Sequence, residues 1–184
     1  MSDAQFDVVV FGATSFVGQI LCQYLTDIYG VDGDLKWAAA GRSKDKLEQV
    51  KAQLGQAGSA LPLLTADAND AASLDTLCAQ TRVVISTVGP YALYGEPMIR
   101  ACVSSGTDYC DLTGEVQWIA AMLEKYEDQA KQSGARIVHC CGFDSIPSDM
   151  GTYFLQQQAR ARFMAPATRV KMRVKVAKGG VSGG

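Results

Sequence analysis

Hydrophobic and polar positions along the chain switch regularly between two periods. Short apolar runs that favour buried strands lie at residues 6–11, 35–40, 61–66, 82–88, 107–112 and 136–141. Between these runs, apolar positions recur at helical spacing over residues 16–28, 44–57, 71–79, 96–105 and 115–132. Six strands that alternate with helices predict a parallel sheet with right-handed crossovers, which is a doubly wound α/β fold.

Individual positions make these predicted elements more specific. The run at 82–88, RVVISTV, is so uniformly apolar that we expect a central strand covered on both faces. Gly30 suits the C-cap of the first helix, and Asp70 suits the N-cap of the third. Three helices carry apolar positions at helical spacing, and these are Phe16, Val17, Ile20, Leu21, Tyr24, Leu25 and Ile28 in the first, Leu47, Val50 and Leu54 in the second, and Leu74, Leu77 and Cys78 in the third.

The pattern changes after residue 142. Pro147 suits the first turn of a helix that we expect to run to about residue 162. Residues 168–177 then alternate between basic and apolar positions, which predicts an antiparallel strand with one solvated face. We therefore expect a first domain over residues 1–145 and the beginning of a second domain, apparently truncated, over residues 146–184. The alternative is that residues 146–184 pack on the first domain as an appendage.

Composition and charge narrow the class of protein. Of the 184 residues, 48% are hydrophobic and 20% are charged, which is typical of a globular protein. The net charge of −2 argues against a generally basic nucleic-acid-binding protein. No stretch reaches the ~18 continuous apolar residues of a membrane span. The N-terminal residues resemble neither a signal peptide nor a transit peptide, so we expect a cytoplasmic protein.

The six cysteines form no CxxC pair and no cluster with zinc-ligand spacing. Most lie in apolar segments, where a free cysteine behaves as a small hydrophobic residue. We therefore expect reduced cysteines and no metal site. The adjacent Cys140 and Cys141 are interpreted as buried residues at a strand end rather than as a redox pair.

A glycine-containing turn joins the first strand to the first helix. Such a turn directs backbone N–H groups and the positive end of the helix dipole toward an anion. Gly12 permits a tight turn, Gly18 permits close helix–sheet packing, and Ser15 replaces the usual middle glycine. The context predicts a Rossmann-type dinucleotide site, whose first contacts would be Gly12, Ala13, Thr14, Ser15, Phe16, Val17 and Gly18.

The end of the second strand indicates which dinucleotide is bound. An NAD-specific fold usually has Asp or Glu there to bind the ribose 2′-hydroxyl. This strand instead runs into Arg42 and Ser43, with Lys44 next to them. An arginine guanidinium makes paired, charge-assisted bonds to phosphate, so we predict NADP with NAD as the less favoured alternative.

Two further loops are expected at the same edge of the sheet. Ligands of doubly wound folds lie beyond the carboxyl ends of the strands. Asp67 and Ala68 follow the third strand, where an adenine edge is read. The residues expected beside the ribose and nicotinamide are Thr87, Val88, Gly89 and Pro90.

Five separated blocks carry a resemblance to a known family. GATSFVG, AGRSKDKLE, VGPYALYGEPMIRAC, DYCDLTGE and GFDSIPSDMG occur in this order between residues 12 and 151. Together they resemble the saccharopine dehydrogenase-like oxidoreductases, also called the trans-acting enoyl reductase family, in which the position of Ser15 is usually glycine. The resemblance implies an N-terminal NAD(P)-binding domain, a chain that continues into a second domain, and chemistry on saccharopine or on long-chain lipid intermediates. If the chain continues into a second domain and the whole protein carries out this chemistry, the present chain would be the cofactor-binding part of an enzyme.

The residues that would carry catalysis are less specific. None of the seven tyrosines has a lysine four residues later, so the Tyr-x-x-x-Lys site of short-chain reductases is absent from the sequence. Candidates near the expected nicotinamide are Tyr91 and Tyr94, as proton donors, ring-stacking groups or simple loop-covering residues, and Asp144, which would position substrate. His139 is interpreted as a core residue rather than as a general acid.

From these features we expect an NADP-dependent oxidoreductase that transfers hydride to an enoyl or imine substrate, in lipid metabolism. We expect this chain to bind cofactor with little turnover of its own, because a second domain normally closes over the nicotinamide. The partners expected are a small, lipid-linked substrate, a peripheral membrane surface and a second copy of the chain. The alternatives are a non-catalytic dinucleotide-binding module and a saccharopine-type amino-acid dehydrogenase.

Overall fold

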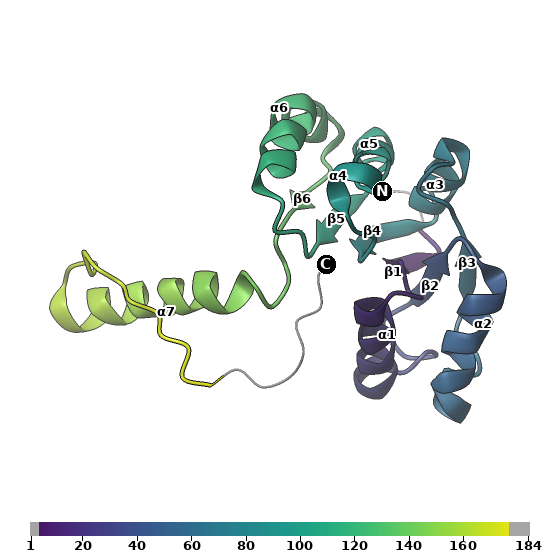
Figure 1. The fold of residues 1–184 in the computed structure, drawn as a ribbon, viewed down its shortest axis with the longest axis horizontal. Helices are drawn as coiled ribbons and strands as arrows, with labels where there is room; N and C mark the ends of the chain where they lie inside the picture. The colour runs from purple at the N-terminus through teal and green to yellow at the C-terminus, as the bar shows by residue number, and fades with distance from the viewer. Residues whose placement is uncertain (1–3, 177–184) are drawn as a thin grey trace.

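The computed structural model describes residues 4–176. Its strands are β1 (Phe6–Phe11), β2 (Trp37–Gly41), β3 (Leu63–Thr65), β4 (Thr81–Ser86), β5 (Asp108–Asp111) and β6 (Ile137–Val138). Its helices are α1 (Phe16–Tyr29), α2 (Lys44–Gln53), α3 (Ala71–Cys78), α4 (Tyr91–Tyr94), α5 (Glu96–Ser105), α6 (Val116–Ser133) and α7 (Ile146–Phe163), with a short 3₁₀ turn at Gly55–Gly58. The six strands are parallel and lie in the order β3-β2-β1-β4-β5-β6, which confirms the doubly wound α/β fold (Figure 1).

The helices form a layer on each face of the sheet. Alternation along the strands explains why both faces are apolar, because successive side chains point in opposite directions. In β2, Trp37 and Ala39 join the core beneath α1 and α2, whereas Ala38 and Ala40 join the core beneath α3, α5 and α6. Figure 1 shows the same division, with α1 and α2 on one side of the sheet and α3, α4, α5 and α6 on the other.

The order of the strands sets the position of any ligand. β1 and β4 lie next to each other at the centre of the sheet, where the strand order reverses direction. The central position predicted for the strand at 82–88 is therefore confirmed. In such a sheet the crevice at the carboxyl ends of the two central strands is where ligands bind.

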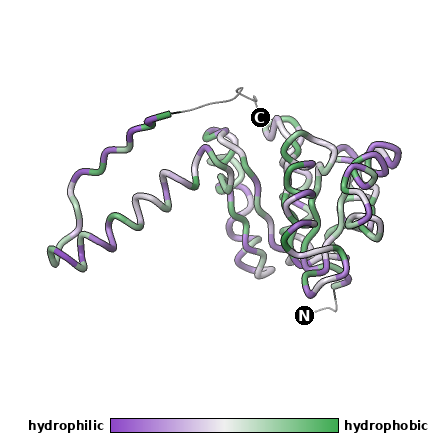
Figure 2. Tube along the Cα trace, turned by 90° about the horizontal axis from the view of Figure 1, so that it is seen from below, coloured by the Kyte–Doolittle hydropathy of each residue, from purple (hydrophilic) through white to green (hydrophobic). Residues whose placement is uncertain are grey.

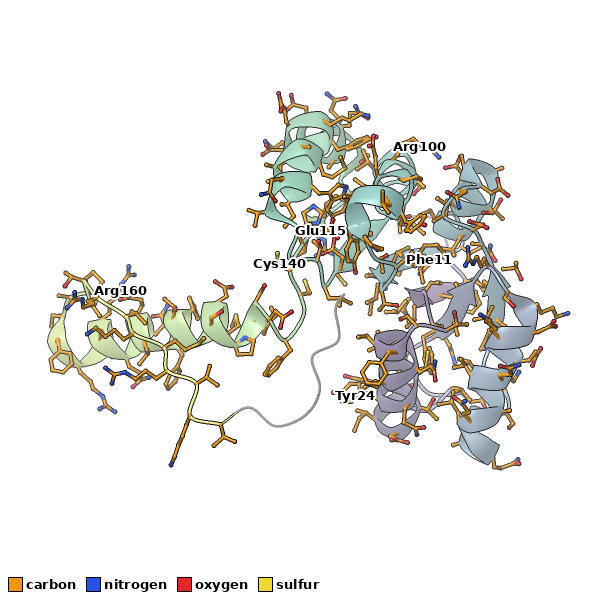
Figure 3. All side chains as sticks on the ribbon, viewed as in Figure 1. Phe11, Tyr24, Arg100, Glu115, Cys140 and Arg160 are labelled. Carbon is orange, nitrogen blue, oxygen red and sulfur yellow. The ribbon has the colours of Figure 1, made fainter. Side chains whose placement is uncertain are left out.

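Most predicted helices match the structure, and the inward residues of α2 and α3 are those expected. Asp70 caps α3 and Gly30 caps α1, as predicted. In α1 the apolar positions divide between two faces. The buried residues are Gly18, Cys22, Leu25 and Thr26, whereas Phe16, Ile20, Tyr24 and Ile28 are exposed, and Tyr24 projects outward in Figure 3. The four-residue helix α4 was not predicted, and β6 is shorter than predicted.

The chain leaves the sheet after β6. Helix α7 extends away from the layered part of the molecule in two perpendicular views (Figures 1 and 2), and none of its residues is buried. The antiparallel strand predicted at 168–177 is wrong for residues 168–176, which form no strand, and residue 177 lies outside the described range. Since a strand is stabilised by a neighbouring strand, alternation alone does not produce one where no partner strand lies beside it.

Candidate cofactor-binding site

The turn between β1 and α1 is the centre of the candidate site. It follows β1 at the reversal point of the sheet, and it leads directly into a 14-residue helix. The backbone amides of Gly12 and Ala13 donate to the carbonyl of Ala40 at 2.9 and 3.1 Å, which fixes the start of the turn against β2. The helix N-terminus is thereby directed along the edge where dinucleotide phosphates bind in this fold.

Two glycines make this turn possible. Gly12 has φ +90°, and a Cβ there would lie 2.7 Å from Thr87 Oγ1. Gly18 packs so closely that a Cβ there would lie 2.2 Å from the carbonyl oxygen of Gly12. A side chain at either position would require the backbone to move, so the two glycines set the curvature of the turn.

Ser15 stands where the middle glycine is usual, and its hydroxyl is used locally. Ser15 Oγ accepts a hydrogen bond from the Gly18 amide at 2.9 Å, so the side chain is the N-cap of α1. The same oxygen lies 3.0 Å from Thr87 Oγ1, which itself donates to the Gly12 carbonyl at 2.9 Å. Ser15 therefore ties the first turn to the loop that follows β4.

The first turn also has donors available for an anion. The amides of Thr14, Phe16 and Val17 donate to no acceptor in the part of the chain that the structure describes. These N–H groups lie at the positive end of the α1 dipole. The donor set fits the pyrophosphate of a dinucleotide, even though Ser15 replaces glycine.

The end of β2 supplies the positive charge expected for a 2′-phosphate. Arg42 is exposed and forms no salt bridge among residues 4–176. Ser43 is the N-cap of α2 and accepts a long hydrogen bond of 3.4 Å from the Lys46 amide. Lys44 begins the helix. No carboxylate follows the strand at this point, so the position that selects NAD is basic instead.

The loop after β3 contains hydrogen bonds between its own residues and the start of α3. Asp67 Oδ1 accepts from the Asn69 amide at 2.9 Å, and the Asp67 amide donates to Ser73 Oγ at 3.1 Å. Ala68 is buried in the core beneath α3. Asp67 is thus partly accessible at the predicted edge, whereas the Ala68 side chain faces inward.

The loop after β4 runs beside the first turn. The amide of Thr87 donates to the Phe11 carbonyl at 2.9 Å, which continues the β1–β4 ladder into the loop. Val88 is half-buried, and Gly89 and Pro90 are exposed. The structure therefore brings the predicted Thr87–Pro90 segment next to the phosphate-binding turn.

Tyr91 is held inside the fold. Its side chain is 4% exposed, and its hydroxyl donates to the Ser86 carbonyl at 2.9 Å. The Leu112 amide donates to the same hydroxyl at 3.4 Å, so Tyr91 links the ends of β4 and β5. Burial raises the pKa of Tyr91 well above its ordinary value of 10.0. This geometry favours the structural alternative over proton donation, because the hydroxyl is already committed to the backbone.

Tyr94 and Asp144 are more accessible than Tyr91. Tyr94 is 37% exposed at the end of α4, and Asp144 is exposed in the loop that precedes α7. Ser145 precedes that helix as its N-cap residue but makes no side-chain capping bond. The catalytic roles predicted for Tyr94 and Asp144 stay predictions.

Glu115 fixes the segment that follows the β4 loop. Its two carboxylate oxygens accept hydrogen bonds from the amides of Tyr91 and Ala92 at 2.7 and 2.8 Å. The carboxylate thus binds the first two amides of α4. Because Glu115 directly precedes α6, this contact holds α4 against the start of α6. This contact could not be found from the sequence, because α4 was not predicted.

A buried carboxylate organises the end of β5. Asp111 accepts from Tyr109 Oη at 3.0 Å and from the amides of Thr113 and Cys140 at 3.2 and 3.1 Å. His139 Nδ1 lies 2.7 Å from Asp111 Oδ2, and the His139 side chain is only 8% exposed. The His139 side chain is therefore largely buried, and its Nε2 has no partner among the described residues.

The cysteines divide into buried and accessible groups. Cys22, Cys78 and Cys102 are buried, and burial raises the pKa of the Cys22 thiol to about 12. Cys141 is exposed and Cys140 is intermediate, so the predicted burial of this pair is wrong for Cys141. Cys140 has φ +61°, which is uncommon for a residue other than glycine, and the Cys141 amide donates to the Asp111 carbonyl at 2.7 Å.

The described residues contain neither a cluster of metal ligands nor a membrane-spanning helix. Within residues 4–176, no group of three or more His, Cys, Asp or Glu side chains is arranged to hold a metal ion. None of the helices seen in this range is both long enough and apolar enough to cross a bilayer.

Comparison with known proteins places this geometry in context. Residues 8–138 match the family described as the saccharopine dehydrogenase NADP binding domain. A Mycobacterium tuberculosis protein provisionally named a trans-acting enoyl reductase is 44% identical over 180 residues, which cover 98% of this chain and 42% of that protein. A Mycobacterium ulcerans trans-acting enoyl reductase is 44% identical over 161 residues, covering 86% of this chain and 38% of that one. The chain therefore spans about two fifths of the length of these relatives.

Among solved structures, the fold is similar to an apo saccharopine dehydrogenase (L-Glu forming) from Saccharomyces cerevisiae. The TM-score is 0.66, and the match covers 85% of this chain and 32% of that chain. Sequence identity is 19%, so the likeness concerns the fold. It supports the doubly wound architecture independently of the strand order described above.

Proposed function

The chain belongs to the family of the saccharopine dehydrogenase NADP binding domain, and from this membership we propose that it is the cofactor-binding part of an NADP-dependent oxidoreductase. The observation that carries the proposal is the pairing of two features at one sheet edge. The first is the Gly12–Gly18 turn with its unused amides, and the second is the basic end of β2 at Arg42. A dinucleotide with a 2′-phosphate matches both.

The proposed contacts follow the carboxyl edge of the sheet. The pyrophosphate would be bound by the amides of the α1 first turn, with Ser15 holding that turn in shape. Arg42 and Ser43 would bind the 2′-phosphate, and Asp67 would lie near the adenine. The Thr87–Pro90 loop would contact the ribose and nicotinamide.

The proposed reaction is a reduction. The reduced nicotinamide supplies a hydride, and this chain's own residues supply orientation and exclude water. Glu115 and Tyr91 hold the loop after β4 in one geometry. Tyr94 and Asp144 are the proposed groups for handling a proton or positioning substrate, because Tyr91 is committed to the backbone.

For the substrate we propose an enoyl or imine compound, with a lipid-linked enoyl group preferred. Proteins 44% identical to this chain bear the name trans-acting enoyl reductase, which supports that preference. We further propose that residues 1–145 form the dinucleotide-binding domain and that residues 146–184 begin a substrate or dimerisation domain. On this proposal the chain alone binds cofactor with little turnover, in the cytoplasm or at a membrane surface.

One observation favours a second candidate function, a dinucleotide-binding module without catalysis. The chain has no Tyr-x-x-x-Lys pattern, and the buried hydroxyl of Tyr91 is held by the Ser86 carbonyl. Transfer of deuteride from labelled NADPH to an enoyl substrate by the longest soluble form of the protein would separate the two functions. Deuterium in the reduced product would support the oxidoreductase, whereas binding of NADPH with no reduced product would support the module.

The first experiment is a calorimetric titration with NADPH and NADH. We expect NADPH to bind at least tenfold more tightly than NADH, a difference of ~1.4 kcal/mol. Arg42→Ala should remove most of this preference, because the guanidinium loses its phosphate partner. The binding of NADH should change little, because NADH has no 2′-phosphate.

The matched control is Arg82→Ala. Arg82 lies near the amino end of β4, whereas Arg42 follows the carboxyl end of β2. Arg82 makes a solvent-exposed salt bridge with Asp7 at 3.3 Å. The control removes the same charge from the protein but should leave both affinities unchanged. Equal binding of NADPH and NADH by the native chain would overturn the proposed cofactor preference, and equal losses in both variants would overturn the role of Arg42.

A further inference from the structure

Two cysteines from neighbouring parts of the chain's sheet meet at its carboxyl edge. Cys110 lies in β5, and its register partner in β6 is Val138. Cys141 follows β6, and its Sγ lies 3.6 Å from the carbonyl oxygen of Val138, so the thiol is folded back along the strand. The thiols of Cys110 and Cys141 are hydrogen-bonded to each other. The two sulfur atoms are therefore neighbours, although the residues are far apart in the sequence.

The backbone holds Cys141 at this level of the sheet. Its amide donates to the carbonyl of Asp111, the residue after Cys110, at 2.7 Å. Cys140 donates its own amide to Asp111 Oδ1 at 3.1 Å. Both amides after His139 are thus bound by one residue of β5, and these contacts keep Cys141 beside Cys110.

Accessibility distinguishes this pair from another pair of thiols in the described chain. The sulfur atoms of Cys78 in α3 and Cys102 in α5 lie 3.7 Å apart, but the two residues are 1% and 0% exposed. Cys141 is exposed, and Cys110 is half-buried. Thiol–disulfide exchange requires a reagent to reach the attacking sulfur. In the folded chain, the pair at the sheet edge is therefore the one that can react.

We propose that Cys110 and Cys141 form a reversible redox pair, whose disulfide fixes the loop after β6 to β5. The oxidant is a small-molecule disulfide such as oxidised glutathione. The proposal goes beyond the proposed function and does not rest on it, because it requires neither a bound dinucleotide nor hydride transfer.

Two exchange steps close the disulfide. The Cys141 thiol first loses its proton, and its sulfur attacks one sulfur of oxidised glutathione, which breaks that disulfide and releases one glutathione thiolate. The Cys110 thiol then loses its proton and attacks Cys141 Sγ, which breaks the mixed disulfide and releases the second thiolate. Two protein thiols are oxidised, one glutathione disulfide is reduced, and the two released thiolates take up the two protons.

The surroundings of the two sulfur atoms make the exchange slow and the product persistent. Burial raises the pKa of Cys110 to about 12 and also raises the pKa of Cys141, and the Asp111 carboxylate acts in the same direction. Few thiolates are therefore present near neutral pH, which slows the attack. The reduced pair is also not stabilised as a thiolate, so the disulfide should resist reduction once it has formed.

The test is incubation of the reduced 184-residue chain with oxidised glutathione, followed by mass spectrometry. The native chain should lose two free thiols, and dithiothreitol should restore them. Cleavage before aspartate residues assigns the bond, because Asp108 separates Cys102 from Cys110. The proposed disulfide should join fragment 108–110 to fragment 128–143.

Variants of single cysteines separate the two exchange steps. Cys110→Ser should stop after the first step and carry one glutathione on Cys141, because the thiol for the second step is missing. Cys141→Ser should abolish the bond between the two fragments. Cys140→Ser is the matched control, since it removes the adjacent thiol, and it should close the disulfide as the native chain does. Circular dichroism shows whether each variant keeps the fold.

Hydrogen exchange measures the effect of the disulfide on the loop after β6. The amides of residues 142–145 should exchange more slowly in the oxidised native chain than in the reduced chain. Cys141→Ser, treated with the same oxidant, should show no such change.

Several results would overturn the proposal. A bond confined to fragment 128–143 would show that Cys140 and Cys141 react with each other instead. A bond inside fragment 75–107, which contains Cys78 and Cys102, would show that accessibility does not select the pair. A native chain that keeps all its thiols, or that carries glutathione without closing a disulfide, would exclude the redox pair. Unchanged exchange of residues 142–145 after oxidation would contradict the fixing of the loop.

Discussion

Ser15 occupies the position at which dinucleotide-binding turns carry their middle glycine. Its hydroxyl accepts from the Gly18 amide and contacts Thr87, so the residue works as a helix cap and as a link between two loops. The substitution leaves the neighbouring amides of Thr14, Phe16 and Val17 without acceptors in the described chain. Serine in place of glycine therefore adds hydrogen bonds that stabilise the turn, while the backbone amides that could bind an anion stay available.

Replacing this serine should cost stability. Ser15→Ala removes an N-cap, and we expect the free energy of unfolding to fall by ~1 kcal/mol. Urea unfolding followed by circular dichroism measures the change. NADPH affinity should fall less than threefold, because the hydroxyl is not expected to bind the phosphate.

Ser43→Ala is the matched control, since Ser43 caps α2 through a longer bond of 3.4 Å to the Lys46 amide. It should be less destabilising than Ser15→Ala. Equal losses in the two variants would contradict the special role given to Ser15 in the first turn.

Other contacts at the residue scale could not be predicted from sequence. Tyr91 and Glu115 are separated by 24 positions, and Ser15 and Thr87 by 72. Their contacts depend on how the strands lie side by side, which local patterns do not encode. The sequence indicates that Tyr91 is near the site, but only the structure shows that its hydroxyl is turned into the sheet.

Elements were predicted best where a single local signal was strong. The β1–turn–α1 unit combines an apolar strand, glycines and an amphipathic helix, and it was found with its bounds. The inward face of α1 was harder, because Phe16, Ile20 and Tyr24 follow the same helical spacing as the buried positions. Apolar periodicity alone cannot show which of two apolar faces meets the sheet.

One ion pair beside the paired strands β5 and β6 titrates. The Arg136 guanidinium donates to the Asp108 carboxylate, including Nε to Oδ2 at 2.9 Å, and the Arg136 amide donates to Oδ1 at 2.9 Å. The Arg136 side chain holds the pKa of Asp108 below its ordinary value of 3.8. Since this carboxylate titrates lower in the folded state, its stabilising effect is complete above pH ~3.9 and is lost as the pH falls through the folded pKa.

Asp108→Asn should therefore lower the melting temperature at pH 7 by a small amount. The difference in melting temperature from the native protein should shrink as the pH falls below the pKa that the Asp108 carboxylate has in the unfolded chain. The native Asp108 then becomes protonated as well. Thermal unfolding at a series of pH values measures this. Asp32→Asn, at an exposed residue that makes no salt bridge among residues 4–176, is the control and should show no such trend. A difference that grows toward acid pH would contradict the sign.

At the scale of the whole molecule, the sheet and its helices contain both apolar cores. No residue of either core lies beyond Ile137, and α7 contributes none. This distribution supports the proposed boundary near residue 145. In the segment after it, the helix predicted from Pro147 to about residue 162 matches α7, whereas the predicted strand is absent from residues 168–176.

A shortened chain that ends at residue 145 should therefore fold. We expect its melting temperature to lie within a few degrees of that of the 184-residue chain and its NADPH affinity to lie within about threefold. Loss of cooperative unfolding on truncation would show instead that residues 146–176 belong to the same folding unit.

The lengths of the strands differ systematically across the sheet. The central strands β1 and β4 have six residues each, whereas the outermost strands β3 and β6 have three and two. An edge strand presents unpaired backbone groups that can recruit strands from other molecules. Here each edge offers only a short stretch of such backbone, three residues in β3 and two in β6. Short edges of this kind disfavour polymerisation of the protein through its sheet edges. They therefore favour folded protein that stays in solution over amyloid-like deposits.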